Sequence, residues 1–170
     1  MRSRRLLLAF VIAAIGVGYY FCNQQVNPVT GEKQHVAMTP DQEVALGLQA
    51  APQMAEQFGG LHPDPAVQSA GEGLGESIVA RSAARGSGYR YDFHVLRDPE
   101  TVNAFALPGG QVFITAALLG RLRDEAQLAG VLGHEIGHVV GRHSAEHLAK
   151  AQLTQVLVGA AGVAASSEDS

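Results

Sequence analysis

The sequence predicts an α+β fold in which several helices pack against a small antiparallel sheet. Apolar residues recur at helical spacing over 128–140. Large apolar residues alternate with other side chains over 89–96, as they do in a strand with one buried face. Two further short strands are expected over 102–106 and 111–114, and the turn residues 107–110 join them. Helices and strands that mix in this way within one stretch of chain are typical of the α+β class.

Helix-start signals place the first helix. Thr39 is followed by Pro40 and, three positions after the threonine, by Gln42, a pattern that forms a capping box. The helix is expected to reach about Phe58. Pro52 is expected to kink or split it, because proline has no backbone N–H to donate to the helical ladder.

The next segment is expected to contain a second helix, the three strands and a short helix. The second helix should span 65–84, although three glycines weaken it. In the strand 89–96, His94 falls on the polar face, so we expect a solvated ring and no metal ligand. Thr115 is expected to cap a short helix over 116–122.

The run His134-Glu135-Ile136-Gly137-His138 is an HExxH motif within the helix that Asp124 is expected to cap. Residues four apart on a helix differ by about 40° around the axis and about 6 Å along it, so both imidazoles can reach one metal ion. Two histidines and a glutamate in a largely apolar, core-facing helix are costly unless a metal or hydrogen bonds satisfy them. We therefore predict that His134 and His138 bind one Zn²⁺ per chain. Glu135 is predicted to be the catalytic base that takes a proton from water and passes it to the leaving amine.

Three glycines add a stripe to the same helix, because Gly133, Gly137 and Gly141 are spaced four apart. Each costs about 1 kcal/mol relative to alanine in a helix interior. The stripe either allows another backbone or a substrate to approach closely, or reflects simple small-residue packing. Both interpretations stay open at this point.

The residues around the motif resemble a known family. The run Asn103-Ala104-Phe105-Ala106-Leu107-Pro108-Gly109-Gly110, the strand after it, Glu125 and the run HEIGHVVGRH are similar to the HtpX/Oma-type zinc metalloendopeptidases. The segments 27–31 and 39–43 resemble bacterial envelope members of that family. The resemblance covers about residues 27 to 150. It implies a zincin-like fold of the gluzincin type and zinc-dependent hydrolysis of peptide bonds.

In that family the third zinc ligand is a glutamate on a later helix, and this chain shows no such residue before it ends at Ser170. On a straight helix, His143, Glu146 and His147 would all point away from the ion, and only a helix break would bring one of them close. The sequence therefore predicts a chain truncated at its C-terminus, with the third ligand downstream and weak metal binding by two ligands alone.

A related zinc motif, HExxHxxGxxH, is excluded because Ser144 stands where its last histidine is required. His143 comes one residue too early for that pattern. We expect it to lie on a helix face or to donate a hydrogen bond to a metal ligand.

Residues 1–22 are expected to be a signal sequence or an N-terminal membrane anchor. Three arginines precede an uncharged run from Leu6 to Cys22, which predicts a cytoplasmic N-terminus. The run is intermediate in length between a signal-peptide core and a full span. A small-x-small site ending at Gly18 permits cleavage, whereas the aromatic residues 19–21 favour an uncleaved anchor. Lipidation of Cys22 is disfavoured by the bulky residue before it.

The remaining organisation follows from composition. We expect a linker or extended arm at 23–38, a metalloprotease domain incomplete at its C-terminus at 39–166, and a polar tail at 167–170. The apolar segment 153–165 is too short to span a bilayer alone. It is a helix continuation, half of a membrane hairpin, or core without its partner. A net charge of −4 with no basic patch beyond the first residues argues against nucleic-acid binding.

These expectations combine into a zinc metalloendopeptidase that hydrolyses misfolded or misassembled envelope proteins in protein quality control. It would be membrane-anchored facing the periplasm, or periplasmic after signal cleavage. Gln111, Val112 and Phe113 are expected to hold the substrate as an added β-strand at a sheet edge. The missing third ligand supports an alternative, a catalytically incomplete, chaperone-like envelope assembly factor with a vestigial metal site. A non-proteolytic metal hydrolase is a third interpretation, against which the resemblance argues.

Overall fold

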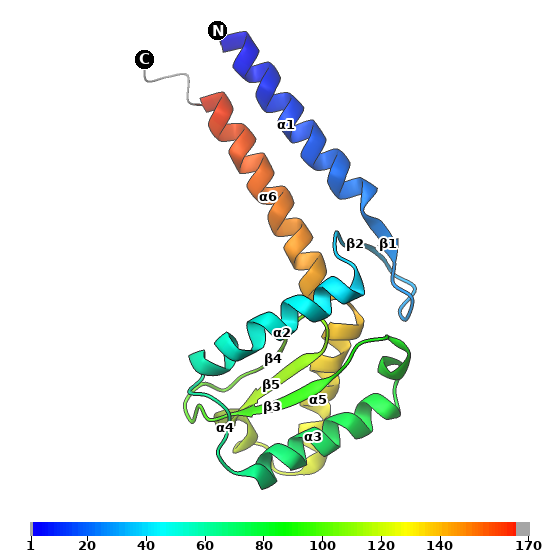
Figure 1. Ribbon diagram of the computed structural model, residues 1–170, viewed down its shortest axis with the longest axis vertical. Coiled ribbons are helices and arrows are strands. Elements are labelled where there is room, and N and C mark those ends of the chain that lie inside the picture. Colours follow the sequence, from blue (N-terminus) through cyan, green and yellow to red (C-terminus); the bar gives the residue numbers. More distant parts are fainter. Residues whose placement is uncertain (1, 166–170) are drawn as a thin grey trace. The chain divides into compact units, whose positions relative to one another are not determined.

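The computed structural model describes residues 2–165, and the chain divides into two compact units (Figure 1). Unit 2 holds Met38–Ser144 together with the short segment Pro28–Gly31, and it carries the HExxH motif. Unit 1 holds the residues before Pro28, the segment Glu32–Ala37 and the chain from Ala145 onward. The predicted polar tail at 167–170 lies outside the described residues.

A three-stranded sheet forms the centre of unit 2, with β3 (Asp92–Leu96), β4 (Ala104–Ala106) and β5 (Gln111–Thr115) in the order β3-β5-β4. β4 is antiparallel to β5, but β3 is parallel to it. The prediction of an antiparallel sheet is therefore wrong for one of its two pairings. The reason is topological: β5 inserts between β3 and β4, and after two chain reversals it runs in the same direction as β3.

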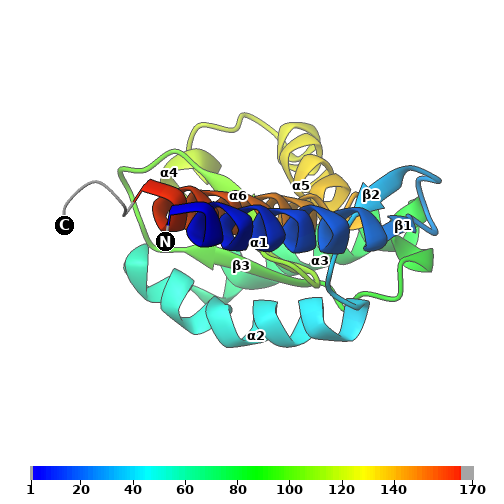
Figure 2. The same ribbon diagram turned by 90° about the horizontal axis from the view of Figure 1, so that it is seen from above.

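Helices cover both faces of this sheet (Figure 2). The helices α3 (Pro65–Ala80) and α5 (Glu125–Val140) pack on the face that carries Phe93 and Val112. The helix α2 (Pro40–Gln57) lies over the opposite face. Buried residues of the sheet, of α5 and of the turn after α3 form one hydrophobic cluster: Ala84, Phe93, Val112, Leu132, Ile136 and Val140.

Within the run 103–110, Gly109 is required by the approach of α2, whereas Gly110 lies against the backbone of Arg90. A Cβ at Gly109, whose φ is +81°, would overlap the backbone of Val44 in α2. A Cβ at Gly47 would in turn overlap the carbonyl oxygen of Pro108. Backbone thus meets backbone where α2 crosses the turn between β4 and β5, and no side chain fits between them.

The predicted helix starts are confirmed, because Thr39, Asp64, Thr115 and Asp124 are all N-caps whose side chains accept a backbone hydrogen bond. Of the kink or split expected at Pro52, the split is excluded, since α2 continues through Pro52 to Gln57. The second helix ends at Ala80, and a 3₁₀ turn, η1 (Ala83–Gly86), replaces its expected last residues. The short helix after β5, α4, covers only Ala116–Leu119.

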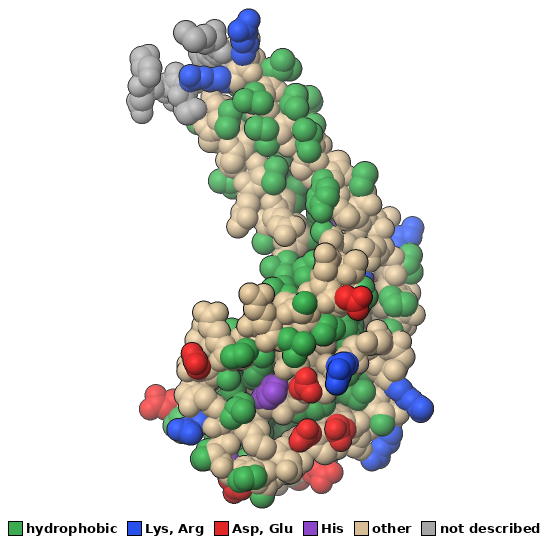
Figure 3. Space-filling model, in the orientation of Figure 1, with side chains coloured by type: hydrophobic (Ala, Val, Ile, Leu, Met, Phe, Trp, Pro, Cys, Tyr) green, Lys and Arg blue, Asp and Glu red, His purple; other side chains and the backbone are tan. Residues whose placement is uncertain are grey.

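Unit 1 contains the helix α1 (Arg2–Cys22) and all but the first two residues of α6 (His143–Ala165). Within the described residues, these two helices are long and apolar enough to cross a membrane, by length and composition alone. Figure 3 shows apolar side chains exposed along α1 and basic ones at its N-terminal end. The apolar segment 153–165 is the continuation of α6, one of the three arrangements expected for it.

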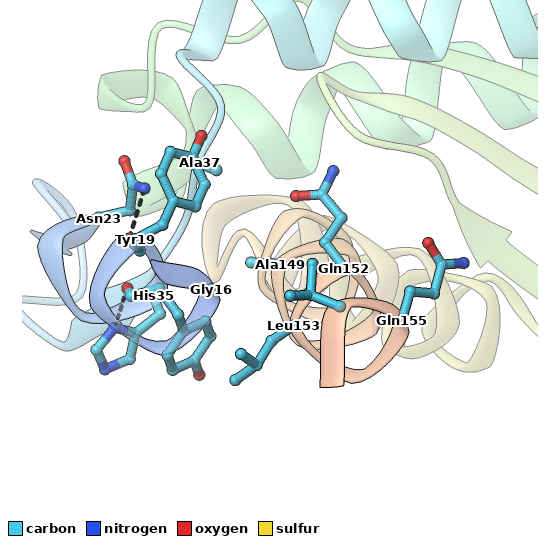
Figure 4. A pocket seen from close by; sticks show the side chains of 11 residues that line it. Gly16, Tyr19, Asn23, His35, Ala37, Ala149, Gln152, Leu153 and Gln155 are labelled. Atoms are coloured by element: carbon cyan, nitrogen blue, oxygen red, sulfur yellow. Dashed lines mark hydrogen bonds between the residues drawn. The ribbon is translucent and has the colours of Figure 1, made fainter. Parts of the chain in front are cut away.

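The expected linker 23–38 contains an antiparallel pair of strands, β1 (Gln24–Val26) and β2 (Lys33–His35). Beside them, α1, β2 and α6 enclose a cavity of about 450 Å³ within unit 1 (Figure 4). His35 lies on its wall, with Nδ1 3.1 Å from the carbonyl oxygen of Tyr20. None of the predicted site residues lines this cavity.

Candidate metal centre

The two histidines of the HExxH motif meet at one point beside α5. Their Nε2 atoms lie 3.0 Å apart, and their rings are edge to face with centroids 4.6 Å apart. Two tetrahedral zinc ligands with Zn–N distances of about 2.0–2.1 Å have nitrogens about 3.3 Å apart. The spacing of His134 and His138 therefore fits a metal ion that both Nε2 atoms share.

The motif lies on the outer face of α5. Leu132 and Ile136, which point into the core, are only 1% and 3% exposed. His134 is exposed, while Glu135 and His138 are half-buried. α5 faces the core as expected, but the three polar side chains of the motif are not buried in it, because α5 is amphipathic and apolar side chains fill its inward stripe. The case for a metal therefore rests on the convergence of the two nitrogens.

The glycine stripe is open along most of its length. A Cβ at Gly133 or at Gly137 would meet no atom within 4 Å among the described residues. Small-residue packing against another element of the described chain is therefore excluded at these two positions. Gly141 differs from them, because a Cβ there would overlap the imidazole ring of His143.

Glu135 has a carboxylate that no other described side chain engages. Neither a hydrogen bond nor an ion pair joins it to the residues over 2–165. It lies between the two histidines in sequence, on the same helix. A half-buried carboxylate without a protein partner is available to accept a proton from a water molecule.

The helix breaks directly after the motif. α5 ends at Val140, α6 begins at His143, and Arg142 between them adopts a φ of +54°. The break turns His143 back, so that its Nδ1 lies 2.7 Å from Nδ1 of His138. The helix is not straight here, and of the two positions expected for His143 the structure has the contact with a predicted metal ligand. His143 meets the ring nitrogen of His138 that does not face His134, which makes it a hydrogen-bond partner of a predicted ligand.

A buried ion pair holds this break. The Nε of Arg142 donates to Oε1 of Glu43 at 2.8 Å, and a terminal nitrogen donates to the same carboxylate and to the carbonyl oxygen of Met38, the latter at 2.8 Å. Glu43 and Arg142 are 1% and 6% exposed. The hydroxyl of Tyr89 donates to the other carboxylate oxygen at 3.0 Å. Burial and the adjacent negative charge of Glu43 raise the pKa of Tyr89 well above its ordinary value.

Sequence reasoning missed Glu43, Tyr89 and Arg142. One signal for Glu43 was its spacing of four from Gly47, which puts both residues on one face of the helix. In the structure that face packs against the turn between β4 and β5. A carboxylate on an inward helix face requires a buried partner. The identity of that partner is not visible in local sequence.

A third ligand is not found in the described part of the chain. Within 2–165, no group of three His, Cys, Asp or Glu side chains is arranged to hold a metal ion. The identity of the third ligand stays a prediction that the described residues do not test.

The predicted substrate strand is not at a sheet edge. β5 pairs with β3 on one side and with β4 on the other, so its backbone cannot receive an added strand, and the edge prediction is wrong. All five of its residues, Gln111, Val112 and Phe113 included, are buried. The Gln111 amide hydrogen-bonds Asp92 and His94, and the Phe113 ring stacks between those of His94 and Phe105. His94 is accordingly half-buried, although it was expected to be solvated.

The free edge next to α5 belongs to β4. The carbonyl of Asn103 accepts from the N–H of Thr115 and the N–H of Leu107 donates to the carbonyl of Gln111, so in an antiparallel register the residues of odd number face β5. Ala104 and Ala106 therefore direct their N–H and C=O groups away from the sheet. β4 packs along α5, and Ala106 contacts the cluster that contains Leu132 and Ile136.

Comparisons with known proteins point to the same chemistry. The model of Peptidase family M48 matches residues 65–170. The mitochondrial metalloendopeptidase OMA1 of Schizosaccharomyces pombe is 33% identical over 164 residues, covering 92% of this chain and 47% of that protein. The beta-barrel assembly-enhancing protease of Escherichia coli is 31% identical over 173 residues, covering 94% of this chain and 33% of that protein.

A second bacterial relative, the beta-barrel assembly-enhancing protease of Yersinia pestis, is 33% identical over 130 residues. That alignment covers 76% of this chain and 26% of the relative, so the chain spans less than half the length of each of these proteins. Because the family model covers well over half of the chain and the OMA1 match covers 92% of it, the chain belongs to Peptidase family M48.

Proposed function

We propose that this chain carries the zinc-binding helix of a metalloendopeptidase, and that the complete protein hydrolyses misfolded or misassembled proteins of the bacterial envelope. One observation carries the proposal: His134 and His138 of α5 bring their Nε2 atoms to 3.0 Å from each other. Family membership supports a peptidase. Two relatives bear the name beta-barrel assembly-enhancing protease, which supports an envelope substrate.

The residues of α5 divide the work between metal binding and proton transfer. His134 and His138 would hold zinc through their Nε2 atoms. Bound zinc polarises the scissile carbonyl and lowers the pKa of water. Glu135 accepts a proton from the attacking water and delivers it to the leaving amine. Its carboxylate is suited to this role because it has no competing partner among the described residues.

The substrate would bind along β4. Ala104 and Ala106 offer outward N–H and C=O groups to an extended peptide, which would add a fourth strand beside α5. Backbone pairing of this kind depends little on substrate side chains, as degradation of diverse misfolded proteins requires. The assignment moves substrate binding from Gln111, Val112 and Phe113 to the neighbouring strand.

The protein would act at the membrane. α1 is long and apolar enough to span a bilayer, and the basic residues before its apolar run favour a cytoplasmic N-terminus. This orientation would put the peptidase part in the periplasm, whether α1 remains as an anchor or is removed as a signal sequence.

The test uses the complete protein and an unfolded substrate such as casein. Chelator should abolish cleavage, and added Zn²⁺ should restore it. Glu135→Gln should bind zinc as the wild type does and lose nearly all activity, whereas His134→Ala should lose both. Cleavage that survives in Glu135→Gln would refute the role of the carboxylate. Zinc-independent suppression of substrate aggregation, without cleavage, would favour the chaperone-like assembly factor.

A further inference from the structure

We infer that His143 is a positioning residue for the metal ligand His138, and that the buried pair Glu43–Arg142 holds His143 in place. The inference rests on the proposed zinc site. It adds three residues of this chain that act on the site without touching metal or substrate. Their geometry forms a continuous series of contacts from α2, through the break between α5 and α6, to the imidazole of His138.

The two ring nitrogens of His138 face different residues. Its Nε2 faces His134 and would bind the metal, so that in the neutral ring the proton must reside on Nδ1. That Nδ1 lies 2.7 Å from Nδ1 of His143. His138 must then donate and His143 must accept, with the proton of His143 on its own Nε2. A hydrogen bond of this kind fixes the tautomer and the orientation of a ligating imidazole.

The position of His143 depends on the unusual backbone conformation of Arg142, the residue before it. A residue other than glycine with a positive φ is held there only when its surroundings impose it. Arg142 is the one such residue in the described chain, and its φ is +54°. Its buried guanidinium is fixed by the carboxylate of Glu43 and the carbonyl of Met38. These contacts anchor the break that turns His143 toward His138.

The ring of His143 lies against Gly141. Gly141 has a φ of −70°, so its backbone is open to any residue. A Cβ at this position would nevertheless overlap the His143 ring, including its Nε2. A methyl group at 141 would therefore force the ring of His143 to shift, which displaces His143 without removing it.

The experiment measures metal affinity in the complete protein by competition with a chromophoric chelator, for Zn²⁺ and for Co²⁺. His143→Leu is expected to weaken binding about 10- to 100-fold, as loss of a hydrogen-bond partner to a ligating histidine does. Gly141→Ala should weaken binding in the same direction. His143→Gln, whose amide oxygen can accept from His138, should stay close to the wild type. Gly133→Ala is the matched control, since its Cβ meets no described atom. The Co²⁺ absorption spectrum should change in His143→Leu and Gly141→Ala only.

Each outcome has one meaning. Equal affinity of His143→Leu and wild type overturns the inference, and so does a loss in His143→Gln as large as that in His143→Leu. A wild type that binds zinc through His134 and His138 but cleaves no peptide refutes the proposed function, and the affinity series still decides the positioning role. A wild type that binds no metal through these two histidines overturns both.

Discussion

The guanidinium of Arg142 donates through Nε to the carboxylate of Glu43 at 2.8 Å, which joins two residues 99 positions apart in the chain. Both side chains are almost fully buried, and no buried side-chain nitrogen or oxygen of the described residues lacks a hydrogen-bond partner. The pair thus ties the start of α2 to the end of the HExxH helix. Its removal should affect both the stability of unit 2 and the site.

Glu43→Leu should strongly destabilise the protein. It leaves the guanidinium of Arg142 buried without its counter-charge, and breaking a buried pair in this way costs about 3–5 kcal/mol. The measurement is the free energy of unfolding from denaturant titration. Glu146→Leu is the control, because the Glu146–Lys150 pair is partly exposed and such pairs contribute about 0–1 kcal/mol. Similar losses of unfolding free energy in Glu43→Leu and Glu146→Leu would contradict a stabilising role of the buried Glu43–Arg142 pair.

Local features of this fold were predictable from sequence, and long-range ones were not. Thr39 and Asp124 cap their helices because a cap depends on residues within one turn. His134 and His138 share a face for the same reason, since their spacing is helical. The insertion of β5 between β3 and β4 depends on pairing across the sheet, which the alternation of side chains does not encode.

The break between α5 and α6 is also a long-range feature that the local sequence does not predict. A run of residues suited to helix continues from α5 into α6, and the sequence there contains no proline. Arg142 nevertheless leaves the helical conformation, because Glu43 and Met38, distant in sequence, bind its side chain. The sequence allowed a contact between His143 and a metal ligand, but it did not show that the helix breaks at Arg142. The third metal ligand, by contrast, stays a prediction that the described residues do not test.

Gly47→Ala should be destabilising, although alanine is the better helix former. The added Cβ would overlap the carbonyl oxygen of Pro108, which is backbone and cannot rotate away. Overpacking of this kind costs about 1–3 kcal/mol. The measurement is thermal or denaturant unfolding, with Gly133→Ala as the control. Gly133 has open space around it, so that its replacement should stabilise α5 by about 1 kcal/mol. Stabilisation by both changes would show that α2 does not pack on this turn.

Tyr89 should give stability an alkaline dependence. Its pKa is raised by burial and by the charge of Glu43, so the folded state favours the protonated phenol. This contribution is fully present below the unfolded pKa of about 10 and is lost as the pH rises from there toward the folded value. The stability difference between wild type and Tyr89→Phe should therefore shrink above about pH 10. Tyr91→Phe is the comparison. Burial raises the pKa of Tyr91 as well, but the hydroxyl of Tyr91 lies beside Ser87 and not beside the charge of Glu43. A constant difference between wild type and Tyr89→Phe across this range would contradict the shift.

Ala106→Pro should separate substrate binding from folding. The N–H of Ala106 points away from β5, so proline removes no hydrogen bond from the sheet, and edge strands tolerate proline at such positions. If a peptide pairs with β4, the variant loses one backbone donor to the substrate, and the added ring obstructs the edge. We expect kcat/KM for peptide cleavage to fall about 10-fold or more, as the loss of about 1.4 kcal/mol implies, with zinc affinity unchanged. Phe105→Pro is the contrasting variant, because the N–H of Phe105 faces β5 and its loss should destabilise the sheet itself. Full activity in a folded Ala106→Pro protein would exclude strand addition at β4.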